Sequence, residues 1–216
     1  MILQGMHGMF ERLKQITALA SGIGLDLYFR VETRGTVSVE TLGTPPEFSD
    51  SYSPVEWFSL PPVLKRFGIG PDDVFLDLGC GKGRALFIAA CFPFAKVIGV
   101  ELAESLAIAA RRNCESFLRR RHVRCHDIEI IHADAAEYDI APEVTVVFLS
   151  NPFRDVPFDR VLQNIRATVC LNPRTLRVVY HLPVFHRQVL AGLSDLVQVV
   201  IEKPDYVVYE LGVSGG

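Results

Sequence analysis

The stretch that decides the fold is Val74-Phe75-Leu76-Asp77-Leu78-Gly79-Cys80-Gly81-Lys82-Gly83-Arg84. Its first five residues are mostly apolar, which suits a strand covered on both faces of a parallel sheet. Three glycines at alternate positions then break the run, and residues 85–90 can form a helix. Glycine has no Cβ, so a strand, glycine turn and helix can bring backbone close to a nucleotide-like ligand.

A second strand is predicted over Lys96–Glu101, and it ends in a carboxylate. An acid at this position can accept hydrogen bonds from both ribose hydroxyls of a nucleotide. The alternative is a plain α/β domain in which Glu101 is a surface residue. We favour the nucleotide-type site because strand, turn, helix, strand and acid occur in the required order.

These residues resemble a family. Phe75–Arg84, read as FLDLGCGKGR, resembles the first motif of class I S-adenosylmethionine-dependent methyltransferases, and Val97–Glu101 resembles the segment that follows it there. The resemblance covers residues 52 to 212. It implies an α/β fold, a doubly wound Rossmann-like mixed sheet of seven strands with a C-terminal antiparallel hairpin. We expect an N-terminal helical and short-strand extension or cap at 1–52 and the methyltransferase-like domain at 53–216.

The resemblance also implies a cofactor, S-adenosyl-L-methionine, with S-adenosyl-L-homocysteine as its product. Asp77 would orient the methionine end, Glu101 would take the ribose, and Asp134 would accept a hydrogen bond from the adenine amine. Tyr52 matches a Tyr-x-Pro-Thr segment of related methyltransferases in its tyrosine and proline but not in its threonine. A packing aromatic is the alternative for Tyr52, and a helix N-cap is a second role for Asp134. The full predicted cofactor set is Tyr52, Asp77, Gly79, Cys80, Gly81, Gly83, Glu101, Asp134, Ala135 and Asn151.

The methyl acceptor is expected at the end of a fourth strand, predicted over 144–149. Ser150-Asn151-Pro152-Phe153 follows it and resembles the Asn-Pro-Pro-aromatic tetrad of amino- and amide-directed methyltransferases, with one proline missing. It also resembles the Asn-x-Phe segment of class I histone-lysine methyltransferases. The resemblance implies that Asn151 is catalytic and orients an acceptor N–H, with Pro152 and Phe153 beside the substrate. His181 follows a fifth predicted strand and could touch substrate or relay a proton; a buried, satisfied histidine is the alternative.

The N-terminal part shows no recognisable chemistry. Apolar spacing predicts a helix over 9–20 that ends at Gly22 and Gly24, followed by a short strand near 36–39. A cap packed on the main domain and a lid over the active site both fit this region. A second short helix is predicted from Pro54 to about Leu60, with Pro61-Pro62 ending or kinking it. A further turn of helix is then predicted to run to Phe67 with Leu64 inward.

Composition limits the partners and the compartment. The chain has 216 residues and a net charge of −3, so it has no overall attraction to nucleic acid or anionic membrane. No apolar run suits a membrane-spanning helix, and a cytoplasmic location follows by default. Five cysteines without paired spacing argue against disulfides or a metal site. The arginine cluster at 111–124 could bind phosphate or an acidic protein surface, but a solvated helix face is favoured, so nucleic acid is possible rather than expected.

The sequence therefore predicts an S-adenosylmethionine-dependent methyltransferase with an unidentified acceptor, a nitrogen of a protein or small molecule being favoured. An NAD-dependent Rossmann oxidoreductase and a non-catalytic cofactor-binding module are the alternatives. The predicted terminal hairpin and the position of Asp77 inside the first strand argue against the oxidoreductase.

Overall fold

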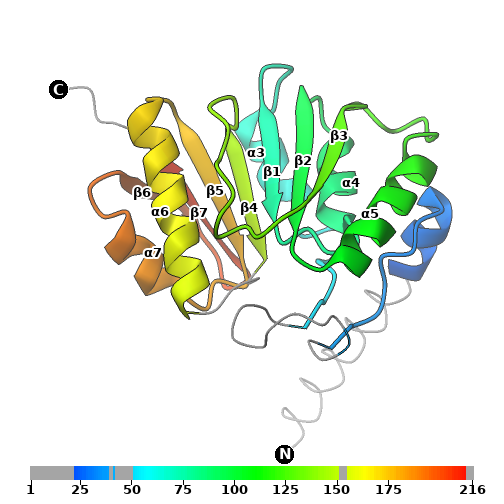
Figure 1. Ribbon diagram of the computed structural model, residues 1–216. Coiled ribbons are helices and arrows are strands. Elements are labelled where there is room, and N and C mark those ends of the chain that lie inside the picture. Colours follow the sequence, from blue (N-terminus) through cyan, green and yellow to red (C-terminus); the bar gives the residue numbers. More distant parts are fainter. Residues whose placement is uncertain (1–21, 39–40, 42–50, 151–154, 213–216) are drawn as a thin grey trace, which may run out of the picture.

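A computed structural model describes residues 22–38, 41, 51–150 and 155–212. Its centre is a seven-stranded sheet, formed by β1 (Val74–Leu78), β2 (Lys96–Glu101), β3 (Ile128–His132), β4 (Val146–Ser150), β5 (Leu176–His181), β6 (Val197–Glu202) and β7 (Tyr206–Leu211). The strand order is β3-β2-β1-β4-β5-β7-β6 (Figure 1). Strands β1 to β5 are parallel, while β7 is antiparallel to both β5 and β6. The predicted Rossmann-like mixed sheet with a C-terminal hairpin is confirmed.

Two layers of helices cover the sheet (Figure 1). One layer contains α3 (Pro61–Phe67), α4 (Arg84–Ala90) and α5 (Glu104–Phe117), and the other contains α6 (Asp155–Leu171) and α7 (His186–Gly192). Each layer forms its own apolar cluster against the sheet. All five residues of β1 are buried, because this central strand is covered on both faces.

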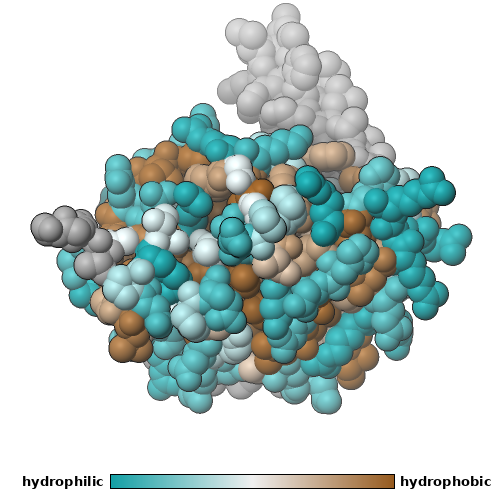
Figure 2. Space-filling view, turned by 90° about the horizontal axis from the view of Figure 1, so that it is seen from above, coloured by the Kyte–Doolittle hydropathy of each residue, from teal (hydrophilic) through white to brown (hydrophobic). Residues whose placement is uncertain are grey.

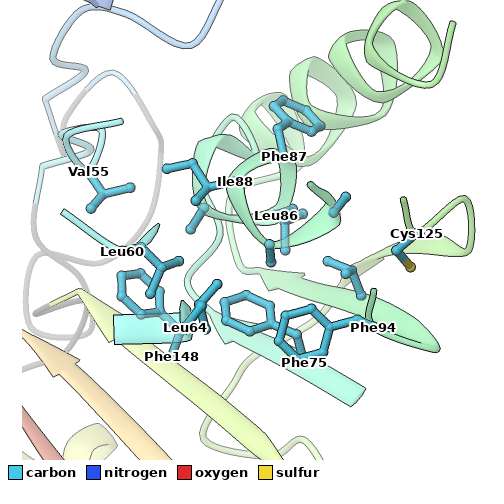
Figure 3. Packing of buried hydrophobic residues seen from close by; sticks show 14 of the residues in the cluster. Val55, Leu60, Leu64, Phe75, Leu86, Phe87, Ile88, Phe94, Cys125 and Phe148 are labelled. Atoms are coloured by element: carbon cyan, nitrogen blue, oxygen red, sulfur yellow. The ribbon is translucent and has the colours of Figure 1, made fainter. Parts of the chain in front are cut away.

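The α3–α4 side of the core is built largely from aromatic and aliphatic side chains that meet over β1 and β4. Leu64 of α3 and Leu86 of α4 point toward Phe75 and Phe148 of the sheet (Figure 3). The rings of Phe75 and Phe148 are 6.1 Å apart and nearly parallel. This packing fixes α4, and with it the glycine turn that precedes α4, against the carboxyl end of β1.

The connection from β3 to β4 contains no helix, and every residue of it is described. Its carbonyl groups instead accept hydrogen bonds from side chains of α6 and the loop after it. Asn164 donates to Ala136, Thr168 donates to Ile140, and Arg174 donates to Val144. Buried backbone acceptors need such partners, so α6 holds this segment in place of the missing helix.

Three local predictions were wrong. Residues 22–29 are helical, so Gly22 and Gly24 do not end a helix there; tertiary packing outweighs the modest cost of glycine in a helix. Residues 54–60 contain a turn rather than a helix, and Pro61-Pro62 begins α3, as proline can where the missing N–H has no helical partner. The expected strand near 36–39 is reduced, among described residues, to one bridge between Val37 and Tyr52.

Candidate cofactor and acceptor site

The glycine turn lies at the carboxyl end of β1, at the lower edge of the sheet in Figure 1. Gly79, Gly81 and Gly83 have φ of 89°, 55° and 91°, a region that favours glycine. The N–H groups of Gly79 and Cys80 both donate to the carbonyl of Val100, at 2.9 and 3.0 Å. The turn is therefore held against the end of the neighbouring strand β2.

Glu101 makes the second connection between the turn and β2. Its buried carboxylate accepts the N–H of Gly81 at 2.7 Å and the N–H of Ala103 at 2.9 Å. Burial raises the pKa of Glu101, and these backbone donors oppose the increase. A carboxylate has about four acceptor positions, so capacity remains for two ribose hydroxyls.

Asp77 is a second buried carboxyl group beside Glu101. Burial raises its pKa well above the ordinary value, and the negative charge of Glu101 adds to the increase. Within the described part of the chain, no hydrogen bond reaches the Asp77 carboxyl. A buried acid in this state gains from a neighbouring cation, since a positive charge stabilises its ionised form.

Tyr52 lies against the turn, although it precedes it by a long stretch of sequence. A Cβ placed on Gly81 would come within 2.2 Å of Cε2 in the Tyr52 ring. The Tyr52 hydroxyl donates to the carbonyl of Thr33 at 2.6 Å, and the Lys82 ammonium lies 5.5 Å from the ring centroid. Tyr52 thus fills the space that the glycine leaves open, and a role in cofactor binding stays a prediction.

Cys80 is buried inside the same turn. Burial raises the pKa of its thiol, and Asp77 and Glu101 add to the increase, so the thiol stays protonated. Its sulfur packs on Gly99 of β2, where an added Cβ would lie 2.8 Å from Sγ and 2.6 Å from Cδ1 of Leu86. The sequence pattern did not indicate a role for Gly99. The structure shows that a glycine is required there because β2 packs directly against Cys80 and Leu86.

Asp134 and Ala135 follow β3 at the same edge of the sheet. The Asp134 carboxylate accepts the N–H of Ala136 at 2.8 Å, and Ala135 is buried. The N–H of Ala133 donates to the carbonyl of Glu101, which brings this segment beside the end of β2. Asp134 therefore accepts a hydrogen bond within its own turn and lies near the predicted ribose contact. The helix N-cap role is not observed, because no helix follows Asp134 in the β3–β4 connection.

The predicted acceptor residues Asn151, Pro152 and Phe153 lie outside the described residues. Just before them, Oγ of Ser150 lies 3.0 Å from Nδ1 of His181, and the two residues are register partners on β4 and β5. The imidazole stacks on Phe148, with ring centroids 6.4 Å apart. Burial lowers the pKa of His181 and Asp205 opposes this shift.

Two arginines of the 111–124 cluster are engaged in hydrogen bonds within the protein. Arg111 donates to the carbonyl of Ile130 and Arg120 to that of Phe29, so both have structural partners. The ring centroids of exposed Tyr28 and His122 are 5.8 Å apart. Figure 2, seen from the edge opposite the glycine turn, shows hydrophilic side chains on the right, where Figure 1 places α5.

No described helix is long and apolar enough to cross a membrane. No group of three or more metal-ligating side chains occurs among residues 22–38, 41, 51–150 and 155–212.

Comparisons with known proteins agree with this architecture. A family model described as "Methyltransferase domain" matches residues 75–171. Among solved structures, a tRNA methyltransferase, TrmI, from Aquifex aeolicus is 12% identical, with 85% of this chain and 91% of that chain covered and a TM-score of 0.56. The glycopeptide N-methyltransferase MtfA, complexed with sinefungin, is 13% identical, with 74% and 87% covered and a TM-score of 0.55. The chain therefore has the fold of these methyltransferases, and residues 75–171 within it match a methyltransferase-domain model.

A curated relative is more similar in sequence over a shorter stretch. It is a "Histone-lysine N-methyltransferase, H3 lysine-79 specific" from Dictyostelium discoideum, 34% identical over 91 residues. The match covers 38% of this chain and 5% of that protein, so the chain spans a small part of the length of this relative.

Proposed function

We propose that this protein transfers the methyl group of S-adenosyl-L-methionine to a nitrogen atom of a protein or small-molecule acceptor. The observation that carries the proposal is the junction of β1 and β2. There the Glu101 carboxylate is hydrogen-bonded to the Gly81 N–H, and the buried Asp77 carboxyl lies within electrostatic reach.

The side chains at this junction fit the cofactor. Asp77 offers a buried acid for the α-ammonium group, and Glu101 keeps acceptor capacity for the ribose hydroxyls. Backbone without side chains at Gly79, Gly81 and Gly83 allows the methionine end to approach. When bound, the sulfonium supplies an activated methyl group with its leaving group already built in. The protein then has to bind, align and exclude water, which can supply most of the rate enhancement.

The choice of nitrogen rests on the acceptor side. The Asn151–Phe153 segment resembles motifs of nitrogen-directed methyltransferases, and the Dictyostelium relative is named as a lysine N-methyltransferase. An amine attacks only as the neutral species. We assign His181 to this side because burial lowers its pKa and its Nδ1 lies in hydrogen-bond contact with Oγ of Ser150. In the tautomer whose Nδ1–H donates to Ser150, the neutral Nε2 would accept a hydrogen bond from an acceptor N–H.

Titration calorimetry with S-adenosylmethionine and S-adenosylhomocysteine tests the cofactor. The wild type should bind both, while Gly81→Arg and Asp77→Ala should lose binding and retain the folded circular-dichroism spectrum. Arg166→Ala removes an exposed ion pair with Asp195 on the α6 side and is the matched control, expected to bind like the wild type. No binding by the wild type refutes the proposal, and fluorescence titration with NADH then tests the oxidoreductase alternative.

Methyl-labelled S-adenosylmethionine tests the acceptor. The label should appear on nitrogen after incubation with peptide, protein and small-molecule pools, followed by hydrolysis and analysis of the methylated products. Label on oxygen or carbon refutes the nitrogen assignment. Cofactor binding without transfer to any pool favours the non-catalytic module.

A further inference from the structure

A buried polar network lies behind the glycine turn and joins N-terminal residues to the start of α4. Asp26, Thr33 and Arg84 are 1%, 0% and 5% exposed. Nε of Arg84 donates to Oγ1 of Thr33 at 2.7 Å, and Nη1 donates to the carbonyl of Val55 at 3.0 Å. Nη2 of Arg84 lies 3.3 Å from the Asp26 carboxylate.

Asp26 is the common acceptor of this network. Its carboxylate takes the N–H of Thr33 at 2.9 Å and the indole N–H of Trp57 at 3.0 Å, in addition to the Arg84 guanidinium. The Arg84 guanidinium also lies 5.5 Å from the Trp57 ring. Each charged group therefore has several partners, as buried charges require.

Stability alone is a weak reason for such an ion pair. Desolvation of two charges offsets much of their attraction, and apolar residues of similar volume often stabilise a core equally well. The guanidinium also lies at the N-terminal end of α4, where the helix dipole disfavours a cation. A positioning role accounts for the charges better, because the planar guanidinium fork fixes several acceptors in one geometry.

The network reaches the cofactor turn through Tyr52. The Thr33 carbonyl accepts the Tyr52 hydroxyl, and the Tyr52 ring packs on Gly81. Arg84 itself directly follows Gly83, the last glycine of the turn. Residues 26–34 are therefore connected to the glycine turn at two points, through Tyr52 at Gly81 and through Arg84 next to Gly83.

Asn113 of α5 adds an independent connection between the same segments. Its Oδ1 accepts the N–H of Glu32 at 2.9 Å, and its Nδ2 donates to the carbonyls of Glu32 and Lys82, both at 3.1 Å. The Lys82 ammonium in turn donates to the carbonyl of Arg34 at 2.8 Å. Residues 26–34 are thus tied to the turn from two sides.

We propose that Arg84 is a positioning residue which, through Asp26 and Thr33, holds Tyr52 against Gly81 and so couples residues 26–34 to cofactor binding. The inference rests on the proposed function, since it takes the turn to bind S-adenosylmethionine. Arg84 acts through its neighbours and is not a catalytic residue. In this arrangement residues 26–34 contribute to cofactor binding by holding Tyr52 in position.

Trp57 provides a specific reporter, because it is the one tryptophan of the chain and belongs to the network. S-adenosylhomocysteine is titrated into the full-length chain and followed both by calorimetry and by tryptophan emission. In the wild type, tryptophan emission should change and saturate as ligand is added, and the midpoint of this change should equal the midpoint of the calorimetric titration. Asp26→Asn/Arg84→Met, which removes both charges together, should weaken binding by roughly tenfold and reduce the emission change.

Further variants separate positioning from folding. Arg84→Lys keeps the charge but not the planar fork and should give intermediate affinity. Tyr52→Phe removes only the hydroxyl bond to Thr33 and should reduce the emission change while lowering the melting temperature by only about 2–4 °C, even if the double variant fails to fold. The Arg166→Met/Asp195→Asn control lies on the α6–α7 side and should leave affinity and emission unchanged.

The outcomes are distinct. A wild type that does not bind S-adenosylhomocysteine overturns the proposed function, on which the inference rests. A wild type that binds, with a folded double variant that matches its affinity and emission change, overturns the positioning role alone. A Tyr52→Phe variant that retains the full emission change also overturns it.

Discussion

Gly81→Ala is expected to damage both stability and cofactor binding by displacing the Tyr52 ring. Gly81 has φ of 55°, where a residue with a side chain costs about 1–2 kcal/mol. The new Cβ would lie 2.2 Å from Cε2 and 2.5 Å from Cδ2 of Tyr52, so the ring must move. Moving it breaks the hydroxyl bond to Thr33, which contributes about 1 kcal/mol. We expect the free energy of unfolding to fall by about 2–3 kcal/mol in total.

Gly68→Ala is the matched control for this change. Gly68 ends α3 with φ of 61°, and a Cβ there would meet no atom within 4 Å. It should therefore cost only the backbone strain of about 1–2 kcal/mol and leave cofactor affinity unchanged. Urea denaturation gives the two free energies of unfolding, and calorimetry with S-adenosylhomocysteine gives the two affinities.

The contact with Tyr52 can then be removed from the comparison. In a Tyr52→Ala background, the cost of Gly81→Ala should fall to that of Gly68→Ala, because the new Cβ no longer meets a ring. The reasoning is refuted if Gly81→Ala costs the same with and without Tyr52, or if it leaves affinity for the cofactor product intact.

Three further outcomes are expected. Burial and Glu101 raise the pKa of Asp77, so the stabilising contribution of this residue is present below about pH 4 and is lost as pH rises through the folded pKa. In thermal melts across pH, Asp77→Asn should remove that loss, and it should also weaken S-adenosylhomocysteine binding. A melting temperature that differs from the wild type by the same amount at all pH values would contradict this. Burial lowers the pKa of His181, so stability should fall as pH drops below about 6.5, and His181→Gln should flatten the melting temperature between pH 7 and 5; an unchanged slope argues against the burial effect. Leu64→Ala, at a fully buried position, should cost about 2–5 kcal/mol by urea denaturation, and a loss below 1 kcal/mol would contradict the packing described for α3.

The sequence alone was sufficient for the centre of the fold. An apolar strand, a glycine turn and a second strand ending in Glu101 are encoded by neighbouring residues, so local conformation and periodicity reveal them. The terminal hairpin was equally readable, because its two apolar runs flank a short polar turn and predict an antiparallel strand in the sheet. The structure shows that this strand, β7, pairs with β5. The same reasoning gave a class of cofactor, because the turn and the acid lie on adjacent strands of one sheet.

Prediction from local sequence was wrong where the same residues are compatible with two different conformations. Pro61-Pro62 can end one helix or begin another, and the choice depended on how Val63 and Leu64 pack into the core. Residues 22–29 stay helical despite two glycines because Phe29 stacks on Trp57 and packs at a tilt against Phe117. Packing of this kind outweighs propensities that differ by about 1 kcal/mol or less.

What the sequence determined by itself is the set of strands, the cofactor turn and the acid that faces it, since each depends on residues close together in the chain. Only the tertiary structure decided that Asp26, Thr33 and Arg84 share a buried network, that Tyr52 covers Gly81, and that Asn113 holds Glu32 across 81 positions of sequence. The physical reason is that a hydrogen bond or a buried charge is specified by the partner that packing brings to it, and no periodicity in the chain encodes a partner so distant.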